Sequence, residues 1–254
     1  MLDCFYWVTT IVGYQNIPVP NGFSFRTVTF NAINAEEFDL TDILPLQADG
    51  TEWAVSGAKR CLGAITIQKI STSGSYGQVY AFYSTKTSDV LDGWQVGSKT
   101  AKVGKGDVTF KSGEGMIISC SKDGALFQVA GAVSLEDTSV AIPNGFSFSG
   151  NCTPVVIDLL DILPLQADGT EWAATGAKRC LGAITVQKIS TSGSYGQAYA
   201  FYSSKTEGVT DGWQVGSKTA KVVRGDVTFE PGEGFIVSCS KDAAIFKFPS
   251  PISE

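Results

Sequence analysis

The sequence contains no histidine in 254 residues. Histidine is the commonest general base, the commonest metal ligand and the usual activator of a nucleophilic serine or cysteine. No CxxC pair is present either, and this removes the usual signature of a zinc site. We therefore expect a protein that is not an enzyme and that binds neither a metal ion nor a cofactor.

Charged residues are scarce, at 17% of the chain, where about a quarter is usual for a soluble protein. The net charge is −6 and no basic cluster interrupts it, so nucleic acid is not an expected partner. No apolar run approaches the roughly 18 residues of a membrane span. The first residues show no basic segment followed by a cleavage site, so an exported protein would be present in its mature form.

The most prominent feature of the sequence is a long internal repeat. The run 42–123 recurs without a gap at 161–242, with most residues identical. Self-similarity of this length indicates one module used twice, and half of the chain is an ordinary domain size. We therefore divide the chain into a first module, 1–128, and a second module, 129–254.

Just before the repeated block, the two modules differ strongly. Residues 26–41 of the first module correspond to a shorter and dissimilar run, 149–160, in the second. The exposed tip 85–91 also varies, as loops do. We expect the parts outside the repeated block to carry the functional difference between the modules.

Short runs rich in Val, Ile, Phe, Tyr and Thr fill both modules, and turn signals such as PNG, ADG and GEG separate them. This pattern is typical of antiparallel strands. The sequence predicts an all-β chain of two tandem β-sandwich or β-barrel domains, with a single helical turn near residues 40–44. In the first module the predicted strands are 5–12, 23–30, 62–70, 78–84, 93–97, 107–110, 115–120 and 125–133.

Four of the six cysteines repeat with the modules, as Cys61 with Cys120 and Cys180 with Cys239. Alternation along their strands places the sulfurs on apolar faces. One interpretation is a disulfide in each module, Cys61–Cys120 and Cys180–Cys239, worth about 4 kcal/mol in the chain-entropy model. The other interpretation is a set of buried thiols that pack as small apolar groups.

Cys4 and Cys152 have no counterparts in the repeat. Cys4 aligns with Ala125, and Cys152 aligns with Thr29. The two cysteines are left to each other, either within one chain or between neighbouring copies. An even cysteine count favours an oxidising compartment, so we expect an extracellular or cell-surface protein.

Several repeated residues resemble ligand sites. Exposed tryptophans beside polar loops can stack on sugar rings, so one hypothesis is a tandem carbohydrate-binding protein. The other interpretation is that each repeated tryptophan starts a strand and packs in the core. The acidic loop with Asp49 and Glu52 lacks calcium-binding spacing, and turn chemistry is the simpler interpretation. The candidate glycan platform consists of Trp53, Trp94, Trp172 and Trp213.

The run GDVTFEPGEGFIVSC (225–239) resembles the P-G-x-G-aromatic hairpin of secreted, β-rich bacterial surface and fibre proteins. The resemblance covers one hairpin in each module, and the first module departs from it at Ser112 and Met116. It implies export and a β fold, and it carries no catalytic residues.

The N-terminal run and the connector between the modules share a layout, an apolar run followed by an approach to PNG. We interpret the N-terminal run as a strand that takes, on the second module of a neighbouring copy, the place that 125–133 takes on the first. Strand addition of this kind uses main-chain hydrogen bonds, and a contact that does not close on itself gives a filament. The leading hypothesis is an extracellular structural subunit that assembles head to tail with itself. The predicted interface strand contains Phe5, Tyr6, Trp7, Val8, Ile11 and Val12.

Overall fold

The protein is described by a computed structural model. It describes residues 12–33, 37–53, 65–70, 76–83, 93–96, 101–121, 125–172, 184–189, 194–202, 211–215, 220–240 and 244–251. Of the predicted strand 5–12, only Val12 lies within the described part.

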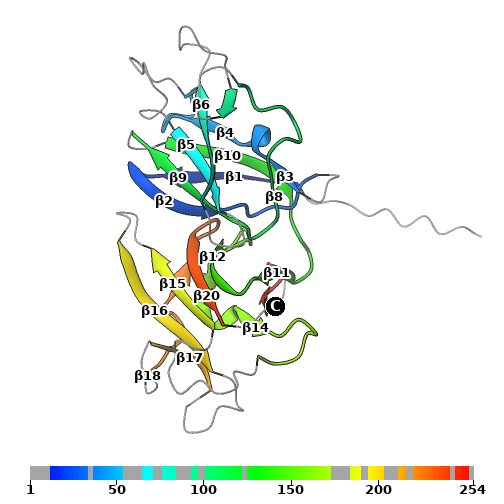
Figure 1. Cartoon of the computed structure of the whole chain (residues 1–254), viewed down its shortest axis with the longest axis vertical. Coiled ribbons are helices and arrows are strands. Elements are labelled where there is room, and N and C mark those ends of the chain that lie inside the picture. The colour runs from blue at the N-terminus through cyan, green and yellow to red at the C-terminus, as the bar shows by residue number, and fades with distance from the viewer. Residues whose placement is uncertain are drawn as a thin grey trace, which may run out of the picture.

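The described residues form antiparallel strands in both modules, which confirms the all-β prediction (Figure 1). A 3-10 turn, η1 (Leu40–Asp42), stands where the single helical turn was predicted. The strands of the first module are β1 (Val12–Val19), β2 (Gly22–Thr27), β3 (Phe38–Asp39), β4 (Leu44–Leu46), β5 (Ile65–Ile70), β6 (Tyr76–Tyr83), β7 (Gly93–Val96), β8 (Thr109–Phe110), β9 (Gly115–Cys120) and β10 (Ala125–Ala132).

The second module repeats this order with one further short strand, β18, and with the turn η3 (Leu159–Asp161) in the place of η1. Its strands are β11 (Thr138–Ile142), β12 (Gly145–Gly150), β13 (Ile157–Asp158), β14 (Leu163–Leu165), β15 (Ile184–Ile189), β16 (Tyr195–Tyr202), β17 (Gly212–Val215), β18 (Ala220–Lys221), β19 (Thr228–Phe229), β20 (Gly234–Cys239) and β21 (Ala244–Phe248).

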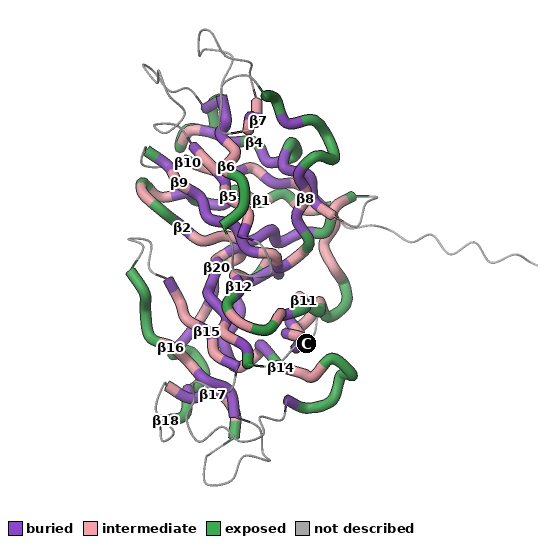
Figure 2. The backbone as a smooth tube through the Cα atoms, in the orientation of Figure 1, coloured by how far each residue is buried: buried purple, intermediate pink, exposed green. Residues whose placement is uncertain are grey.

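Each module packs a larger sheet against a three-stranded sheet. In the first module the orders are β2-β9-β5-β6-β7 and β1-β10-β4; in the second they are β12-β20-β15-β16-β17-β18 and β11-β21-β14. Alternate side chains of each strand point between the sheets, so that each module has its own buried core. Figure 2 shows these buried stretches alternating with exposed ones along the strands.

A sharp corner carries the chain from one sheet to the other at the start of each module. β1 continues into β2 through Pro20 and Asn21, and β11 continues into β12 through the same dipeptide. Gly22 and Gly145, which follow it, have φ values of +99° and +93°, a region that side chains other than glycine rarely adopt. The repeated PNG motif is therefore a corner rather than a hairpin turn.

Two features of the structure differ from the predicted elements. β1 was not predicted as a strand, because Pro18 within it and Pro20 directly after it interrupt the pattern. Pro18 is tolerated because β1 is an edge strand. β10 pairs with β1 as far as Ala132, so the chain leaves the first module's sheet after that residue and not at residue 128. The described part of predicted strand 62–70 is β5, which begins at Ile65.

The two modules lie one above the other along the long axis of the molecule (Figure 1). Between them, β2 and β9 of the first module meet β12 and β20 of the second. We refer to this contact between the four strands, with the turns that precede β9 and β20, as the junction.

Candidate functional site

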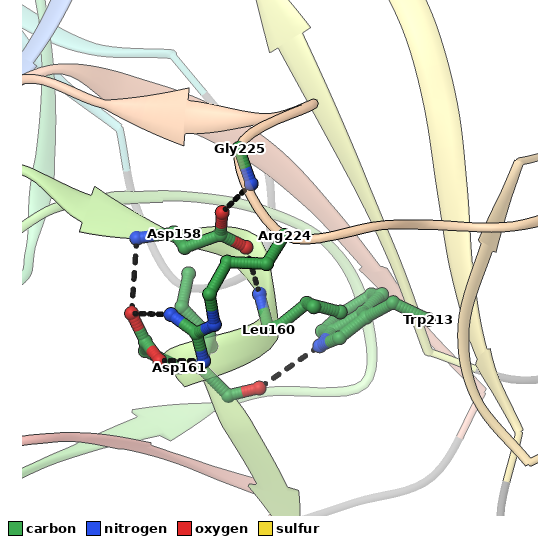
Figure 3. Close-up of polar contacts among 7 residues, drawn as sticks. Asp158, Leu160, Asp161, Trp213, Arg224 and Gly225 are labelled. Atoms are coloured by element: carbon green, nitrogen blue, oxygen red, sulfur yellow. Dashed lines mark hydrogen bonds and ion pairs between the residues drawn. The ribbon is translucent and has the colours of Figure 1, made fainter.

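The four repeated tryptophans lie in the cores, with exposed fractions of 1% for Trp53, 3% for Trp94, 1% for Trp172 and 1% for Trp213. The indole N–H of Trp94 donates to the carbonyl of Ile43 at 2.9 Å. Trp213 makes the equivalent bond to Ile162, also at 2.9 Å (Figure 3). Rings covered on both faces cannot stack on a sugar, so the glycan-platform interpretation of these four residues is wrong.

The acidic loop is held by turn chemistry, as the simpler interpretation predicted. The carboxylate of Asp49 accepts hydrogen bonds from the backbone N–H and the hydroxyl of Thr51, at 3.0 and 2.6 Å. Asp168 and Thr170 repeat both bonds at the same distances. The Thr51 hydroxyl and N–H thereby hold the pKa of Asp49 below its usual value.

A charged cluster surrounds the turn η3 in the second module (Figure 3). Arg224 donates to both carboxylate oxygens of Asp161, at 2.7 and 3.2 Å, and this hydrogen bonding holds the pKa of Asp161 below its usual value. Asp158 accepts from the N–H of Leu160 at 2.8 Å and from that of Gly225 at 2.6 Å. Both carboxylates are thus engaged in tying a loop to the turn, which is a structural role.

The first module has a looser version of this cluster. Lys105 stands in the place of Arg224 and contacts Asp42 at 3.3 Å through a single bond. Beside it lies an open cavity of about 870 Å³, whose lining includes Glu37, Asp39 and Thr109. This cavity lies in the region where the sequences of the two modules diverge.

The described cysteines are all buried. Cys120 and Cys239 are each 2% exposed, as the alternation predicted. Their proposed partners, Cys61 and Cys180, lie outside the described residues, so the two disulfides stay predictions. Cys152 is 4% exposed, and burial raises its pKa to about 12, although a hydrogen bond with Ser112 opposes the shift.

The positions that were expected to bring Cys4 near Cys152 are separated in the structure. Ala125, the counterpart of Cys4, lies opposite Val19 on β1. Thr29, the counterpart of Cys152, hydrogen-bonds Gln15 on the same strand. Gln15 and Val19 are four residues apart, about 13 Å along a strand, so the two counterparts contact different parts of β1. Cys4 itself lies outside the described residues, and the Cys4–Cys152 bond stays a prediction.

The place on the second module that was assigned to a neighbouring copy's N-terminal run is already filled. β21 pairs with β11 and β14, just as β10 pairs with β1 and β4 in the first module. The chain's own C-terminal strand thus completes this sheet. A strand from a second copy must add elsewhere.

The junction is built from equivalent residues of the two modules. At its centre the rings of Phe25 and Phe148 stack in parallel, with centroids 5.0 Å apart. A Cβ atom built on Gly115 would lie 2.6 Å from the Cβ of Phe148, and one built on Gly234 would lie 2.7 Å from the carbonyl carbon of Phe25. Only glycine permits backbones to approach this closely.

The same reciprocity holds beside the stack. A Cβ on Gly113 would clash with Val140, and a Cβ on Gly232 would lie 3.2 Å from Ile17. Ile17 and Val140 are counterparts in the two modules, as are the two glycines. Each module therefore offers its partner the same surface, which is the arrangement of an isologous, two-fold contact.

Hydrogen bonds across the junction keep this layout but use different donors. The N–H of Thr27 donates to the carbonyl of Gly232 at 3.0 Å. The hydroxyl of Ser149 donates to the carbonyl of Gly113 at 2.9 Å. Both carbonyls belong to the repeated GEG turn, so this turn is a contact surface as well as a hairpin.

Sequence reasoning placed the functional differences in 26–41 and 149–160, and the first residues of both segments lie at the junction. It missed the GEG glycines as contact residues, although their exact repetition was a usable signal. It also missed the exposed repeated aromatics, which are Phe23, Phe146, Tyr76 and Tyr195, with exposed fractions of 60–70%.

Comparisons with protein-family models, with curated proteins and with solved structures find no match to this chain. Among the described residues, no helix has the length and hydrophobicity needed to cross a bilayer.

Proposed function

We propose that this chain is an extracellular structural subunit that associates with further copies of itself by addition of a β-strand. The N-terminal run 5–12 is the donor in this proposal, because it is apolar, rich in β-branched and aromatic residues, and directly precedes β1. Addition of such a run to a sheet edge supplies main-chain hydrogen bonds for affinity and alternate side chains for register.

The observation that carries the proposal is the junction. The distinctive glycines of the repeated block pack one module against the other, so the repeat is used for contact between β modules. The contact is two-fold and closes on itself, which makes the two modules one unit. Growth beyond that unit then needs a different contact, and the three-stranded sheets have edge strands, β1 and β4 in one and β11 and β14 in the other, that are candidates for it.

Sedimentation velocity of the full chain over a range of concentrations tests the proposal, together with negative-stain microscopy. We expect species larger than the monomer, which disappear when residues 1–11 are deleted because the donor run is removed. A full chain that remains monomeric at every concentration, with no filaments in the microscope, would contradict the proposal. Non-reducing electrophoresis shows separately whether a disulfide of Cys4 links neighbouring copies.

A further inference from the structure

The junction has two halves that share one layout. In the first half, β1 and β2 meet the turn 230–234 of the second module. In the second half, β11 and β12 meet the turn 111–115 of the first module. Because the halves are built from equivalent positions, a structural difference between them can be traced to the residues that differ.

Arg26 closes the first half. Its Nη2 atom donates to the carbonyl of Pro18 on β1 at 2.7 Å, and its backbone forms an antiparallel bridge with Glu233 of the other module. Burial lowers the pKa of Arg26, while Glu233 acts in the opposite direction. The long side chain thus covers the edge of β1 at this point.

The second half has small residues at the corresponding positions and is open. Ser149 replaces Arg26, Ala141 replaces Pro18 and Ser112 replaces Pro231. A pocket of about 320 Å³ lies here, lined by residues 139–143 of β11 and its corner, by 147–149 of β12 and by 111–114 of the first module. The hydroxyl of Ser147 is buried in this lining and has no hydrogen-bond partner within the described residues.

The two halves also differ in the hydrogen bonds that their edge strands can offer. β1 and β11 each lie at the edge of a three-stranded sheet. The backbone of Pro18 faces away from β10, toward the open side of the sheet. It cannot pair with a further strand there, because proline has no N–H and because the Pro18 carbonyl already accepts from Arg26. Ala141 occupies the same position on β11 and restores the N–H. Within the part of the chain that the structure describes, the edge of β11 is therefore unprotected where the edge of β1 is blocked.

We propose that the pocket beside β11 is the acceptor for the N-terminal run 5–12 of a second copy of this chain. The inference rests on the proposed function and places its contact. The run consists of aromatic and β-branched residues, and the hydroxyls of Thr9 and Thr10 stand next to each other within it. These match walls made by Ile142, Phe148 and the buried hydroxyl of Ser147.

The asymmetry of the junction also fits a linear assembly. Each chain has one N-terminal run, and of the two equivalent edges at the junction, β1 is blocked at Pro18 and β11 is open at Ala141. One donor and one acceptor on different surfaces give a head-to-tail contact that does not close on itself. Two open halves would instead give two acceptors for each donor.

The test uses the full chain and replaces residues of the open half with their counterparts from the blocked half. The double variant Ala141→Pro, Ser149→Arg removes the edge N–H and fills the pocket with residues that the first module already tolerates. We expect species larger than the monomer to be lost in sedimentation velocity. Thermal unfolding must stay within a few degrees of wild type, and the single variant Ser149→Arg provides a second case if the double variant folds poorly. Val223→Ser, at an exposed position outside the pocket, is the matched control.

A synthetic peptide with the sequence of residues 3–13, carrying Ser in place of Cys4, supplies an independent readout. Labelled peptide should bind wild type in fluorescence anisotropy and cap its assembly, and it should bind the double variant at least tenfold more weakly.

If wild type and the double variant assemble equally, the acceptor lies elsewhere: the inference fails and the proposed function stands. If wild type never assembles and the peptide does not bind, both fail. If wild type stays monomeric and only the chain lacking residues 1–11 binds peptide, the run fills its own chain's pocket, and the second copy is excluded.

Discussion

The two modules share one repeated block, yet they differ at the surface where they meet. Inside the block the substitutions keep the cores alike, with Ile67 and Val186 both fully buried. At the junction, Arg26 faces one partner turn, and Ser149 faces the other. Two copies of one fold thus make a symmetric contact whose outer edges are unequal. Conservation of the block preserves the contact, and divergence outside it distinguishes the two ends of the unit.

The largest expected change in the free energy of unfolding comes from variants that test whether the two cores are equivalent. Trp94→Ala and Trp213→Ala should each lower the free energy of unfolding by about 3–5 kcal/mol, because each leaves a large cavity and an unpaired carbonyl. Denaturant unfolding measures the loss. As controls at exposed positions, Tyr76→Ala and Tyr195→Ala should change the free energy of unfolding by about 0.5 kcal/mol or less. Clearly unequal losses for the two tryptophans would contradict equivalent cores.

The symmetry of the junction predicts a second, smaller pair of effects. Gly115→Ala and Gly234→Ala should each destabilise the protein by about 1–3 kcal/mol, since the new methyl group meets the opposing strand. Small-angle scattering should show a larger radius of gyration when the modules separate.

Gly50→Asn serves as the control for the glycine variants, because Gly50 has open space around it and asparagine tolerates its positive φ. A junction variant that behaves like this control would show that the close approach does not matter.

The difference between the two charged turns predicts a still smaller effect of opposite sign in each module. Arg224→Lys should destabilise the second module slightly, because a planar, two-pronged contact with Asp161 becomes a single one. Lys105→Arg should stabilise the first module by a similar amount by gaining the second contact with Asp42. Thermal unfolding of both variants and their combination measures this. The same sign for both single changes would refute the comparison.

Acid should produce the smallest difference. The pKa of Asp161 is lowered in the folded protein, mainly by Arg224, so its stabilisation is present above the ordinary aspartate pKa of about 3.9 and is lost as the pH falls below it. Urea midpoints measured between about pH 5 and pH 2 should fall, and they should fall less steeply for Arg224→Lys. Parallel curves for the two proteins would remove Arg224 as the cause of the lowered pKa.

Much of the fold could be predicted because strands are encoded locally. Alternating Val, Ile, Phe and Tyr predicted β5, β6, β9 and β10, and the same pattern predicted the burial of Cys120. β1 was not predicted, because Pro18 and the following Pro20 break the pattern. Pro18 is tolerated within the strand only because β1 lies at a sheet edge. Whether the repeated tryptophans are buried or exposed also depended on packing, since a tryptophan after a turn can lie on either face of a strand.

By itself, the sequence determined that one β module is used twice, and that the largest divergence between the copies lies before the repeated block. It also marked the GEG turn as a repeated feature. Only the tertiary structure decided what that turn does, because the need for glycine at 115 and 234 comes from a strand of the other module passing over it. The same holds for the pair Arg26 and Ser149. Whether an edge strand is covered or open depends on residues distant in the chain, and these meet only when the modules pack.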